Sequence, residues 1–448
     1  MSQPSDLTAR CQALLAPRLE QRIIPGLERI RGALSSLGHP ERRFRSAIVL
    51  GTNGKGSTAA LLDSVLGAHD LRVGLTTSPH LRQVEERIVV AGEPIASVRL
   101  IELLDQLHAF PDLSYFETLT AAALLEFAAR RVDIAVVEAG LGGRWDASRA
   151  ADPVVALLTN VGTDHLSWLG PTRAHVAAEK AAALSGLEAI VATWDAEVEP
   201  VIRAHADPAT PLSLASQWAS VDRREERRGE RREAQESPYS LRSPLSPDPS
   251  PPRVGSPIRF TIGPCQGEAV LPLAGRHQLA NLTLALAGFA ALAKHGLAPV
   301  PRTEAVAAGI AATRWPGRLD WRLWNGRRLL LDGAHNREAV AVLAAALDGL
   351  VGPWHLLFSC LDDKPLDAMA ALLRPLVASV TVVPVASPRA MAVDRLAAAF
   401  PGCRVATECA TALAVLPDDL PTLVTGSMRL VAEVLSVVEG YRERSDRT

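Results

Sequence analysis

The sequence predicts an α/β protein with two domains, each built on a largely parallel sheet. Short aliphatic runs of strand length alternate with helical patterns along most of the 448 residues. The runs lack polar interruptions, as expected of strands that helices cover on both faces. A chain of this length is also long enough for two or three domains of ordinary size. These observations favour a doubly wound sheet followed by a second, smaller α/β domain.

The first alternation of strands and helices begins near Ser46. Each aliphatic run in it is followed by a longer segment with helical spacing, which is the order that builds a parallel sheet. We expect strands at residues 46–50, 134–137 and 154–159, and helices at residues 57–68, 118–130 and 172–184.

The second alternation follows the helix-breaking pair Pro316-Gly317. We therefore place the hinge at residues 311–313 and expect an N-terminal domain at 1–312 and a C-terminal domain at 313–448. In the latter we expect strands at 329–331, 356–358, 379–383 and 423–424, and helices at 338–347, 366–376 and 430–438.

One segment differs in composition from everything around it. Residues 222–233 hold six Arg and five acidic residues, and residues 237–252 hold six Pro. Such a segment has almost nothing apolar to bury. We expect residues 222–256 to form a disordered insertion at the surface, and the interleaved acidic residues argue against a polyanion-binding role.

Overall composition excludes several classes of protein. Lys and Arg number 47 against 49 Asp and Glu, so the net charge of −2 argues against a nucleic-acid or membrane-surface protein. The five cysteines form no CxxC pair, which argues against a disulfide framework or a cysteine-built zinc site. No leader pattern and no apolar run of membrane-spanning length is present. We expect a cytoplasmic protein, and a monomer, with neither nucleic acid nor membrane as partner.

A glycine-rich loop, GTNGKGS at residues 51–57, lies between the first expected strand and helix. Backbone N–H groups of such a loop converge on an anion, and the helix N-terminus adds partial positive charge. Lys55 can neutralise phosphate oxygens, and the Ser57 hydroxyl can bind Mg²⁺. The other interpretation is a strand-to-helix turn that carries Lys55 by chance. Three glycines with Lys and Ser at this junction favour ATP binding.

Two further residues lie where strands of an open sheet end, the edge at which such sheets bind ligands. Glu138 ends the expected strand 134–137 and offers the hard oxygen that Mg²⁺ prefers. His165 follows the next strand, although a histidine in a loop is more often a surface residue. By spacing alone, Glu179-Lys180 on the expected helix 172–184 is an exposed charged pair.

Taken in order, ten segments resemble the folylpolyglutamate and dihydrofolate synthases, a family within the Mur ligase superfamily of ATP-dependent amide ligases. The resemblance covers nearly the whole chain. The segments are GTNGKGS (51–57), TSPHL (77–81), YFETLT (115–120), EAGLGGRWDAS (138–148), TDHLSWLG (163–170), AEK (178–180), GRHQLANLTLA (275–285), RWPGRLDW (314–321), DGAHN (332–336) and TGS (425–427).

This resemblance implies the Mur ligase fold, with an N-terminal P-loop ATPase domain and a smaller Rossmann-like domain, and a role for each matching residue. It implies ATP contacts at Thr52, Asn53, Gly54, Lys55, Gly56, Ser57, Asn281, Arg318 and Asp332, and Mg²⁺ ligands at Ser57, Glu138 and His165. It implies pterin contacts at Tyr115, Phe116, Glu117, Trp145, Asp146 and Ala147, and glutamate contacts at His335 and Ser427. Lys180 matches a lysine that is carbamylated to N6-carboxylysine, and Lys55, Lys180, Arg318 and His335 would act in catalysis.

The implied reaction joins L-glutamate to dihydropteroate or to the γ-carboxylate of a reduced folate. ATP phosphorylates the acceptor carboxylate, and the glutamate amine attacks the acyl phosphate, which domain closure would shield from water. Mg²⁺, Lys55 and Arg318 would neutralise the crowded oxygens. The alternatives are a ligase acting on a UDP-linked cell-wall precursor, a non-ligase nucleotide-binding switch, and an inactive scaffold. TSPHL and FETLT favour the pterin reading, and we expect both glutamate-adding activities.

Overall fold

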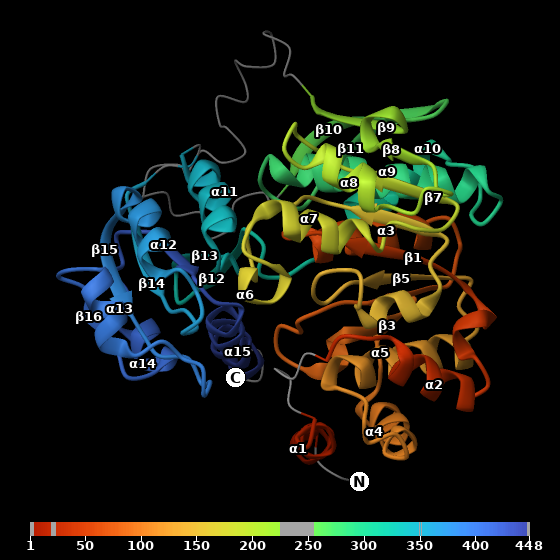
Figure 1. The fold of residues 1–448 in the computed structure, drawn as a ribbon. Helices are drawn as coiled ribbons and strands as arrows, with labels where there is room; N and C mark the ends of the chain where they lie inside the picture. Colours follow the sequence, from red (N-terminus) through yellow and green to blue (C-terminus); the bar gives the residue numbers. More distant parts are fainter. Residues whose placement is uncertain (1–3, 19–23, 225–254, 349, 351, 446–448) are drawn as a thin grey trace. The chain divides into compact units, whose positions relative to one another are not determined.

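The computed structural model describes residues 4–18, 24–224, 255–348, 350 and 352–445, and the chain divides into two compact units (Figure 1). The first unit comprises Met1–Asp222, Ile258–Val270 and Gln278–Thr313. The second comprises Arg223–Pro257, Leu271–His277 and Arg314–Thr448.

The first unit is built on an eight-stranded sheet in the order β4-β3-β2-β5-β1-β6-β7-β8. From β2 through β8 every neighbouring pair is parallel, and β3 and β4 add an antiparallel edge. The strands are β1 (Arg45–Leu50), β2 (Val73–Thr76), β3 (Ile88–Val90), β4 (Glu93–Pro94), β5 (Ile134–Glu138), β6 (Val155–Leu158), β7 (Glu188–Val191) and β8 (Leu212–Leu214).

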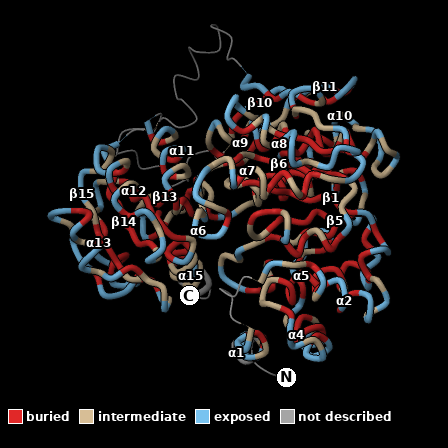
Figure 2. The backbone as a smooth tube through the Cα atoms, viewed as in Figure 1, coloured by how far each residue is buried: buried red, intermediate tan, exposed pale blue. Residues whose placement is uncertain are grey.

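Helices cover both faces of this sheet, so its central strands are fully buried (Figure 2). Helix α5 packs on β5 and α7 packs on β1 and β6 from one face. From the other face, α9 approaches β6 closely at Gly288, where a Cβ would lie 2.7 Å from a side-chain methyl of Leu157. The helices are α1 (Pro4–Leu15), α2 (Glu28–Ser36), α3 (Lys55–Gly67), α4 (Ser97–Leu107), α5 (Tyr115–Ala129), α6 (Leu166–Leu169), α7 (Arg173–Ala181), α8 (Glu199–His205), α9 (His277–Lys294) and α10 (Thr303–Ala312).

A small sheet in the order β11-β10-β9 was not predicted. Its strands are β9 (Ala219–Arg223), β10 (Ser256–Ile262) and β11 (Cys265–Leu271). The predicted insertion at 222–256 is therefore wrong at both ends, because residues 222–223 belong to β9 and Ser256 begins β10. Pairing between these strands overrides the local composition. Residues 225–254 lie outside the described part of the chain.

The second unit has a six-stranded sheet in the order β12-β13-β17-β14-β15-β16, parallel except for the β12–β13 hairpin. The strands are β12 (Asp320–Trp324), β13 (Arg327–Leu331), β14 (Trp354–Phe358), β15 (Val377–Val382), β16 (Arg404–Val405) and β17 (Thr422–Thr425). Helices α11 (Arg337–Leu347), α12 (Leu366–Leu373) and α13 (Val393–Ala399) pack on one core, and α14 (Cys409–Ala414) and α15 (Met428–Ser445) complete the described unit.

The doubly wound α/β class is confirmed, and every strand and helix predicted above is present with shifted ends. The helix predicted at 366–376 ends at Leu373 and continues as a 3₁₀ turn over Arg374–Leu376. Pro375 in that turn has no N–H to continue the α-helix. Among the helices of the described residues, none is both long and apolar enough to cross a membrane.

Candidate active site

The glycine-rich loop connects β1 to α3, with two glycines in backbone conformations that other residues rarely adopt. Gly54 precedes the helix with φ of 84°, and a Cβ there would lie 2.5 Å from Oδ1 of Asn281. A Cβ on Gly51 would lie 1.8 Å from Oγ1 of Thr159. Both positions therefore require glycine, and Asn281, one of the predicted nucleotide contacts, borders the loop.

The segment that follows β6 holds the loop in place. Thr52 N donates to Asn160 O over 3.0 Å, and Asn53 N donates to Asn160 Oδ1 over 3.0 Å. Thr159 Oγ1 and Asn160 Nδ2 both donate to Asn53 O, over 2.7 and 3.0 Å. Gly162 N donates to Thr52 Oγ1 over 2.8 Å. The conformation of the phosphate loop is thus fixed by the neighbouring strand end as well as by its own sequence.

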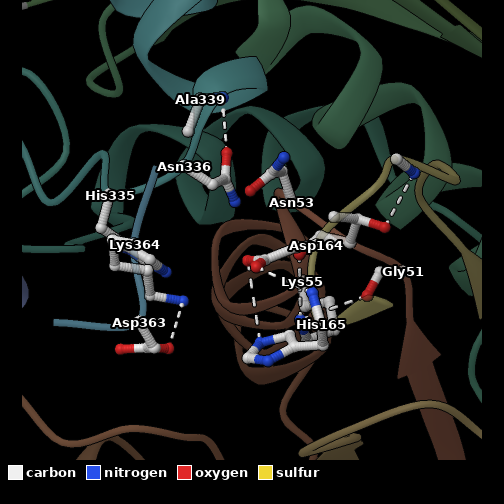
Figure 3. A network of polar contacts seen from close by, with 12 residues as sticks. Gly51, Asn53, Lys55, Asp164, His165, His335, Asn336, Ala339, Asp363 and Lys364 are labelled. Atoms are coloured by element: carbon white, nitrogen blue, oxygen red, sulfur yellow. Dashed lines mark hydrogen bonds and ion pairs between the residues drawn. The ribbon is translucent and has the colours of Figure 1, made fainter. Parts of the chain in front are cut away.

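Two lysine side chains meet at this loop. Lys55 Nζ donates to Gly51 O and Thr52 O, each over 3.2 Å (Figure 3). Lys180 Nζ, on α7, also donates to Gly51 O, over 2.8 Å. Lys180 is 3% exposed, so the interpretation of an exposed surface pair is wrong. The burial of α7 on the sheet, rather than helical spacing, decides this position.

Burial, and after it the positive charge of Lys55, lowers the pKa of Lys180 to about 7. The carboxylates of Asp146 and Asp164 act in the opposite direction. Near neutral pH a large fraction of Lys180 is therefore an unprotonated amine, which is the form that reacts with carbon dioxide.

Glu138 ends β5 at the register position of Val49 in β1, so its carboxylate lies at the strand end next to the loop. It is 5% exposed, and its Oε2 accepts from Ser78 N over 2.9 Å. Ser57, in the first turn of α3, is 3% exposed. A buried carboxylate and a hydroxyl beside a phosphate loop fit Mg²⁺, which proteins commonly bind through one or two carboxylates together with substrate phosphates.

His165 precedes α6 in a left-handed conformation, and its side chain is 41% exposed. Its Nε2 lies 3.7 Å from Oδ2 of Asp164, and its N donates to Asp164 Oδ1 over 2.9 Å (Figure 3). His165 shares the edge of the sheet with Glu138 because Glu138 ends β5, His165 follows β6, and these two strands flank β1. Within the described residues, no group of three or more His, Cys, Asp or Glu side chains could hold a metal ion.

The residues predicted to contact the pterin occupy the start of α5. The ring of Phe116 packs against Gly140, where a Cβ would lie 2.7 Å from the ring. Glu117 is 5% exposed, its carboxylate accepts from Ser114 N over 2.8 Å, and it forms an ion pair of 3.1 Å with Arg29. Glu117 therefore has a helix-capping and segment-fixing role in this structure.

The loop after β5 carries the other predicted pterin contacts. Trp145 is 49% exposed, whereas Asp146 and Ala147 are buried. Asp146 Oδ2 accepts from Leu141 N over 2.7 Å, and its Oδ1 accepts from Ser148 N over 3.0 Å. Burial raises the pKa of Asp146, against these hydrogen bonds, which lower it. Asp146 shapes the loop, and Trp145 is the member of this group that presents an accessible face.

In the second unit, Asp332 directly follows β13 and fixes the loops around it. Its Oδ2 accepts from Leu319 N and its Oδ1 accepts from Ala334 N, each over 2.9 Å. Arg318 lies over Gly333 and donates from Nη1 to Sδ of Met428 over 3.3 Å. Arg318 and Asp332, both predicted nucleotide contacts, are thus neighbours at one end of this sheet.

His335 and Ser427 follow two adjacent strands, β13 and β17. His335 Nδ1 donates to Gly333 O over 2.8 Å, and Ser427 Oγ accepts from Arg429 N over 3.1 Å. The two loops are joined because Gly426 N and Thr425 Oγ1 both donate to the carbonyl oxygen of Ala334, over 3.0 and 3.3 Å. This unit therefore brings the predicted glutamate contacts to the same strand ends.

Sequence reasoning missed residues that share these edges. Ser78 fixes the Glu138 carboxylate through its amide. Lys364 follows β14, the strand beside β17, and its side chain is 8% exposed and 3.5 Å from Asp363 (Figure 3). The sequence did contain a signal for Lys364. The residue follows an aliphatic strand, and residues that follow such strands lie at the ligand-binding edge of open sheets.

Comparisons with known proteins agree with this geometry. Residues 49–289 match the family model described as Mur ligase middle domain, and residues 317–428 match the one described as Mur ligase, glutamate ligase domain. The chain is 35% identical over 408 residues to the dihydrofolate synthase/folylpolyglutamate synthase of Mycobacterium tuberculosis, covering 85% of this chain and 78% of that protein. It is 31% identical over 431 residues to the folylpolyglutamate synthase of Lacticaseibacillus casei, covering 92% of this chain and 94% of that protein.

Solved structures give the same relationship. Mycobacterium tuberculosis folylpolyglutamate synthase complexed with ADP superposes with a TM-score of 0.80 at 31% identity, covering 97% of this chain and 98% of that one. Escherichia coli FolC in complex with DHPP and ADP gives a TM-score of 0.78 at 26% identity, covering 98% and 99%. The bifunctional folylpolyglutamate synthase/dihydrofolate synthase of Yersinia pestis, complexed with AMPPNP and Mn ion, gives a TM-score of 0.77 at 26% identity. The match covers 98% of this chain and 100% of that one.

Proposed function

Since the chain belongs to the Mur ligase family, and within it to the dihydrofolate and folylpolyglutamate synthases, we propose that it joins L-glutamate to pterin-linked carboxylates at the expense of ATP. The acceptors are dihydropteroate and the γ-carboxylate of reduced folates. The observation that carries the proposal is the fixed phosphate loop of the first unit, with Lys55, Lys180 and Glu138 gathered around it.

The first unit binds the nucleotide and activates the acceptor. The loop amides of Thr52–Ser57 and the N-terminus of α3 hold the phosphates, and Lys55 exchanges its contacts with backbone carbonyls for phosphate oxygens. An acceptor carboxylate oxygen attacks the γ-phosphorus of ATP, and the bond from that phosphorus to the bridging oxygen breaks. The products are an acyl phosphate and ADP.

Glu138, Ser57 and His165 would hold magnesium, which would supply charge neutralisation for the phosphate oxygens. Lys180 contributes as a carbamate. Its unprotonated amine forms an N–C bond with carbon dioxide and loses one proton to solvent, which gives an anionic oxygen donor in place of a buried cation. The low pKa of Lys180, about 7, supports this assignment because it leaves much of the amine free to react.

The second unit binds the incoming amino acid and contributes to nucleotide binding. Asp332 and Arg318 contact the nucleotide. His335 and Ser427 receive glutamate, together with Lys364, which the sequence analysis did not identify. The buried ammonium of Lys364 suits a carboxylate ligand. The glutamate amine attacks the acyl carbon, inorganic phosphate leaves, and the amine loses a proton as the amide forms.

The acceptor binds beside Tyr115 and Phe116 at the start of α5, with Trp145 on the neighbouring loop. Phe116 supports this placement because it packs on the same loop that carries Trp145. Aromatic side chains suit a flat heteroaromatic ring. Glu117 and Asp146 act indirectly in this assignment, since both carboxylates are engaged with backbone amides.

The test is glutamate-dependent release of phosphate from ATP and Mg²⁺, measured separately with dihydropteroate and with a reduced folate. We expect turnover with both acceptors and a product mass higher by one glutamyl residue for each turnover. Turnover with one acceptor alone would assign the enzyme to a single step. Turnover only with a UDP-linked cell-wall precursor would instead support the alternative ligase.

We further propose that the enzyme is a cytoplasmic monomer that needs neither nucleic acid nor a membrane. The formal charge of −2 supports the absence of a polyanionic partner. Size-exclusion chromatography with light scattering should give one species near 47.7 kDa. A concentration-independent mass of twice that value would contradict the monomer.

A further inference from the structure

One loop in the first unit is held by contacts that the reaction described so far does not explain. Residues 77–83 connect β2 to the 3₁₀ helix Val84–Arg87. The carboxylate of Glu86 accepts from three successive amides of this loop: Leu81 N over 2.7 Å, and Arg82 N and Gln83 N over 3.1 Å. A carboxylate that accepts three backbone hydrogen bonds fixes the conformation of the segment that donates them.

Arg87 fixes the other half of the loop. It is 4% exposed, and its carbonyl oxygen accepts from Thr77 N over 3.3 Å. Its side-chain Nε donates to Nδ1 of His80 over 2.9 Å. Because a guanidinium group can only donate, Nδ1 of His80 is the acceptor and the imidazole carries its proton on Nε2.

The same guanidinium group contacts the start of α5. Its Cζ lies 5.2 Å from the centroid of the Tyr115 ring, within the range of a cation–π interaction. At the other end of the loop, Ser78 N donates to Glu138 Oε2 over 2.9 Å. One buried side chain is therefore in contact both with the loop that orients the Glu138 carboxylate and with an aromatic residue assigned to the acceptor.

We propose that Arg87 is a positioning residue that holds the His80 imidazole and the Tyr115 ring in the arrangement that the acceptor requires. This inference rests on the proposed function, because it needs the acceptor to bind at the start of α5. Arg87 acts through its two partners and touches neither ATP nor the reacting atoms.

A purely structural arginine would act differently. Its loss would lower the stability of the whole unit. The affinities for ATP and for the acceptor would then either fall together or both stay unchanged. A positioning residue for the acceptor changes acceptor affinity while leaving ATP affinity intact. The change in acceptor affinity relative to the change in ATP affinity therefore distinguishes a positioning arginine from a purely structural one.

The experiment compares Arg87→Lys with wild type. Lysine keeps the charge but has no donor at the position of Nε and no planar group to lie over the ring. The control is Arg99→Lys, because Arg99 on α4 also pairs with a buried acidic residue of this unit, Glu126, and its second ion pair is with Glu102 rather than with the loop. Acceptor Kd is measured by equilibrium dialysis without turnover, and ATP affinity by the same method with a non-hydrolysable analogue.

We expect Arg87→Lys to raise the acceptor Kd by about tenfold, the effect of losing one charge-assisted hydrogen bond. The Kd of the ATP analogue should change less than twofold, and Arg99→Lys should change neither affinity. An acceptor Kd equal to that of wild type, or equal losses for acceptor and ATP analogue, would overturn the proposal.

A second variant keeps the test decisive if Arg87→Lys folds poorly. His80→Ala removes the acceptor of the Arg87 hydrogen bond from a half-buried position and should reproduce the rise in acceptor Kd. In the double variant the two effects on the acceptor Kd should be less than additive, since both substitutions break the Arg87–His80 contact and only Arg87→Lys also changes the contact with Tyr115. Additive effects would show that Arg87 and His80 act independently and would overturn the proposal.

Amide hydrogen exchange separates this inference from the proposed function. The Ser78 amide should exchange faster in Arg87→Lys, whatever substrate the enzyme uses, because the loop that presents it to Glu138 loses a contact. If wild type binds no pterin acceptor but this acceleration occurs, the function is wrong and the role of Arg87 in fixing the loop stands. If wild type binds the acceptor and Ser78 exchange is unchanged, the positioning role is wrong.

Discussion

Replacing Lys180 by Met removes the buried amine while keeping a side chain of similar length. The pKa of this amine is about 7 in the folded protein and 10.5 in the unfolded chain. Between those pH values the unfolded state holds a proton that the folded state has released, so folding becomes more favourable as pH rises. The cost of burying the cation is fully present below pH 7 and disappears as pH approaches 10.5.

The magnitude follows from these two pKa values. From pH 7 to pH 9 the wild type should gain about 2 kcal/mol of unfolding free energy that Lys180→Met does not gain. The matched control is Val176→Ala, a fully buried residue of the same helix that carries no proton. Its loss of stability should be the same at both pH values.

The assay is urea unfolding followed by circular dichroism at pH 7, 8 and 9, in buffer free of carbon dioxide. A difference between wild type and Lys180→Met that stays constant over this range would refute the assignment of a buried, mostly neutral amine. A second readout tests the carbamate directly. With ¹³C-labelled bicarbonate, wild type should show a carbamate ¹³C signal that Lys180→Met lacks, and the variant should lose at least about 99% of kcat.

Other predictions test separate parts of the structure. Gly143→Ala should lower kcat and cost about 1–3 kcal/mol in urea unfolding, because its Cβ would lie 2.7–3.0 Å from backbone atoms of Glu179 and Lys180. Gly32→Ala, in α2 with nothing within 4 Å of the new methyl group, should instead stabilise by up to about 1 kcal/mol and leave kcat unchanged. Thr422→Val should raise the thermal midpoint, since the buried Thr422 hydroxyl has no hydrogen-bond partner among the described residues. Removing Mg²⁺ with a chelator should abolish phosphate release, and adding Mg²⁺ back should restore it.

The fold class was accessible from sequence because the inner strands of the first sheet are largely aliphatic. Burial on both faces imposes that pattern, so β1, β5 and β6 could be recognised without any contact information. The strands β9 and β10 were missed because the residues between them dominate the local composition. Their pairing depends on residues far apart in the chain, and no local signal records it.

The candidate site was partly predictable for a related reason. Residues 51–57 adopt their conformation because glycine alone fits at Gly51 and Gly54, and that requirement is visible in the sequence. The environment of Lys180 is not local, because it depends on how α7 packs against the sheet. By spacing the residue looks exposed, and only tertiary structure gives it a buried position and a low pKa.

Carboxylates of the site divide into two groups by what their oxygens contact. Asp146 and Asp332 each accept two backbone hydrogen bonds, and Glu117 caps α5 by accepting from Ser114 N, so these three carboxylates define local backbone shape. Glu138 instead lies at a strand end, with its Oε2 fixed by an amide from another loop. A metal ligand must keep its orientation while its charge remains available, and an amide neighbour orients a carboxylate without neutralising it. In the proposed assignment of Glu138 as a metal ligand, the loop at 77–83 would therefore contribute to the metal site through the backbone amide of Ser78.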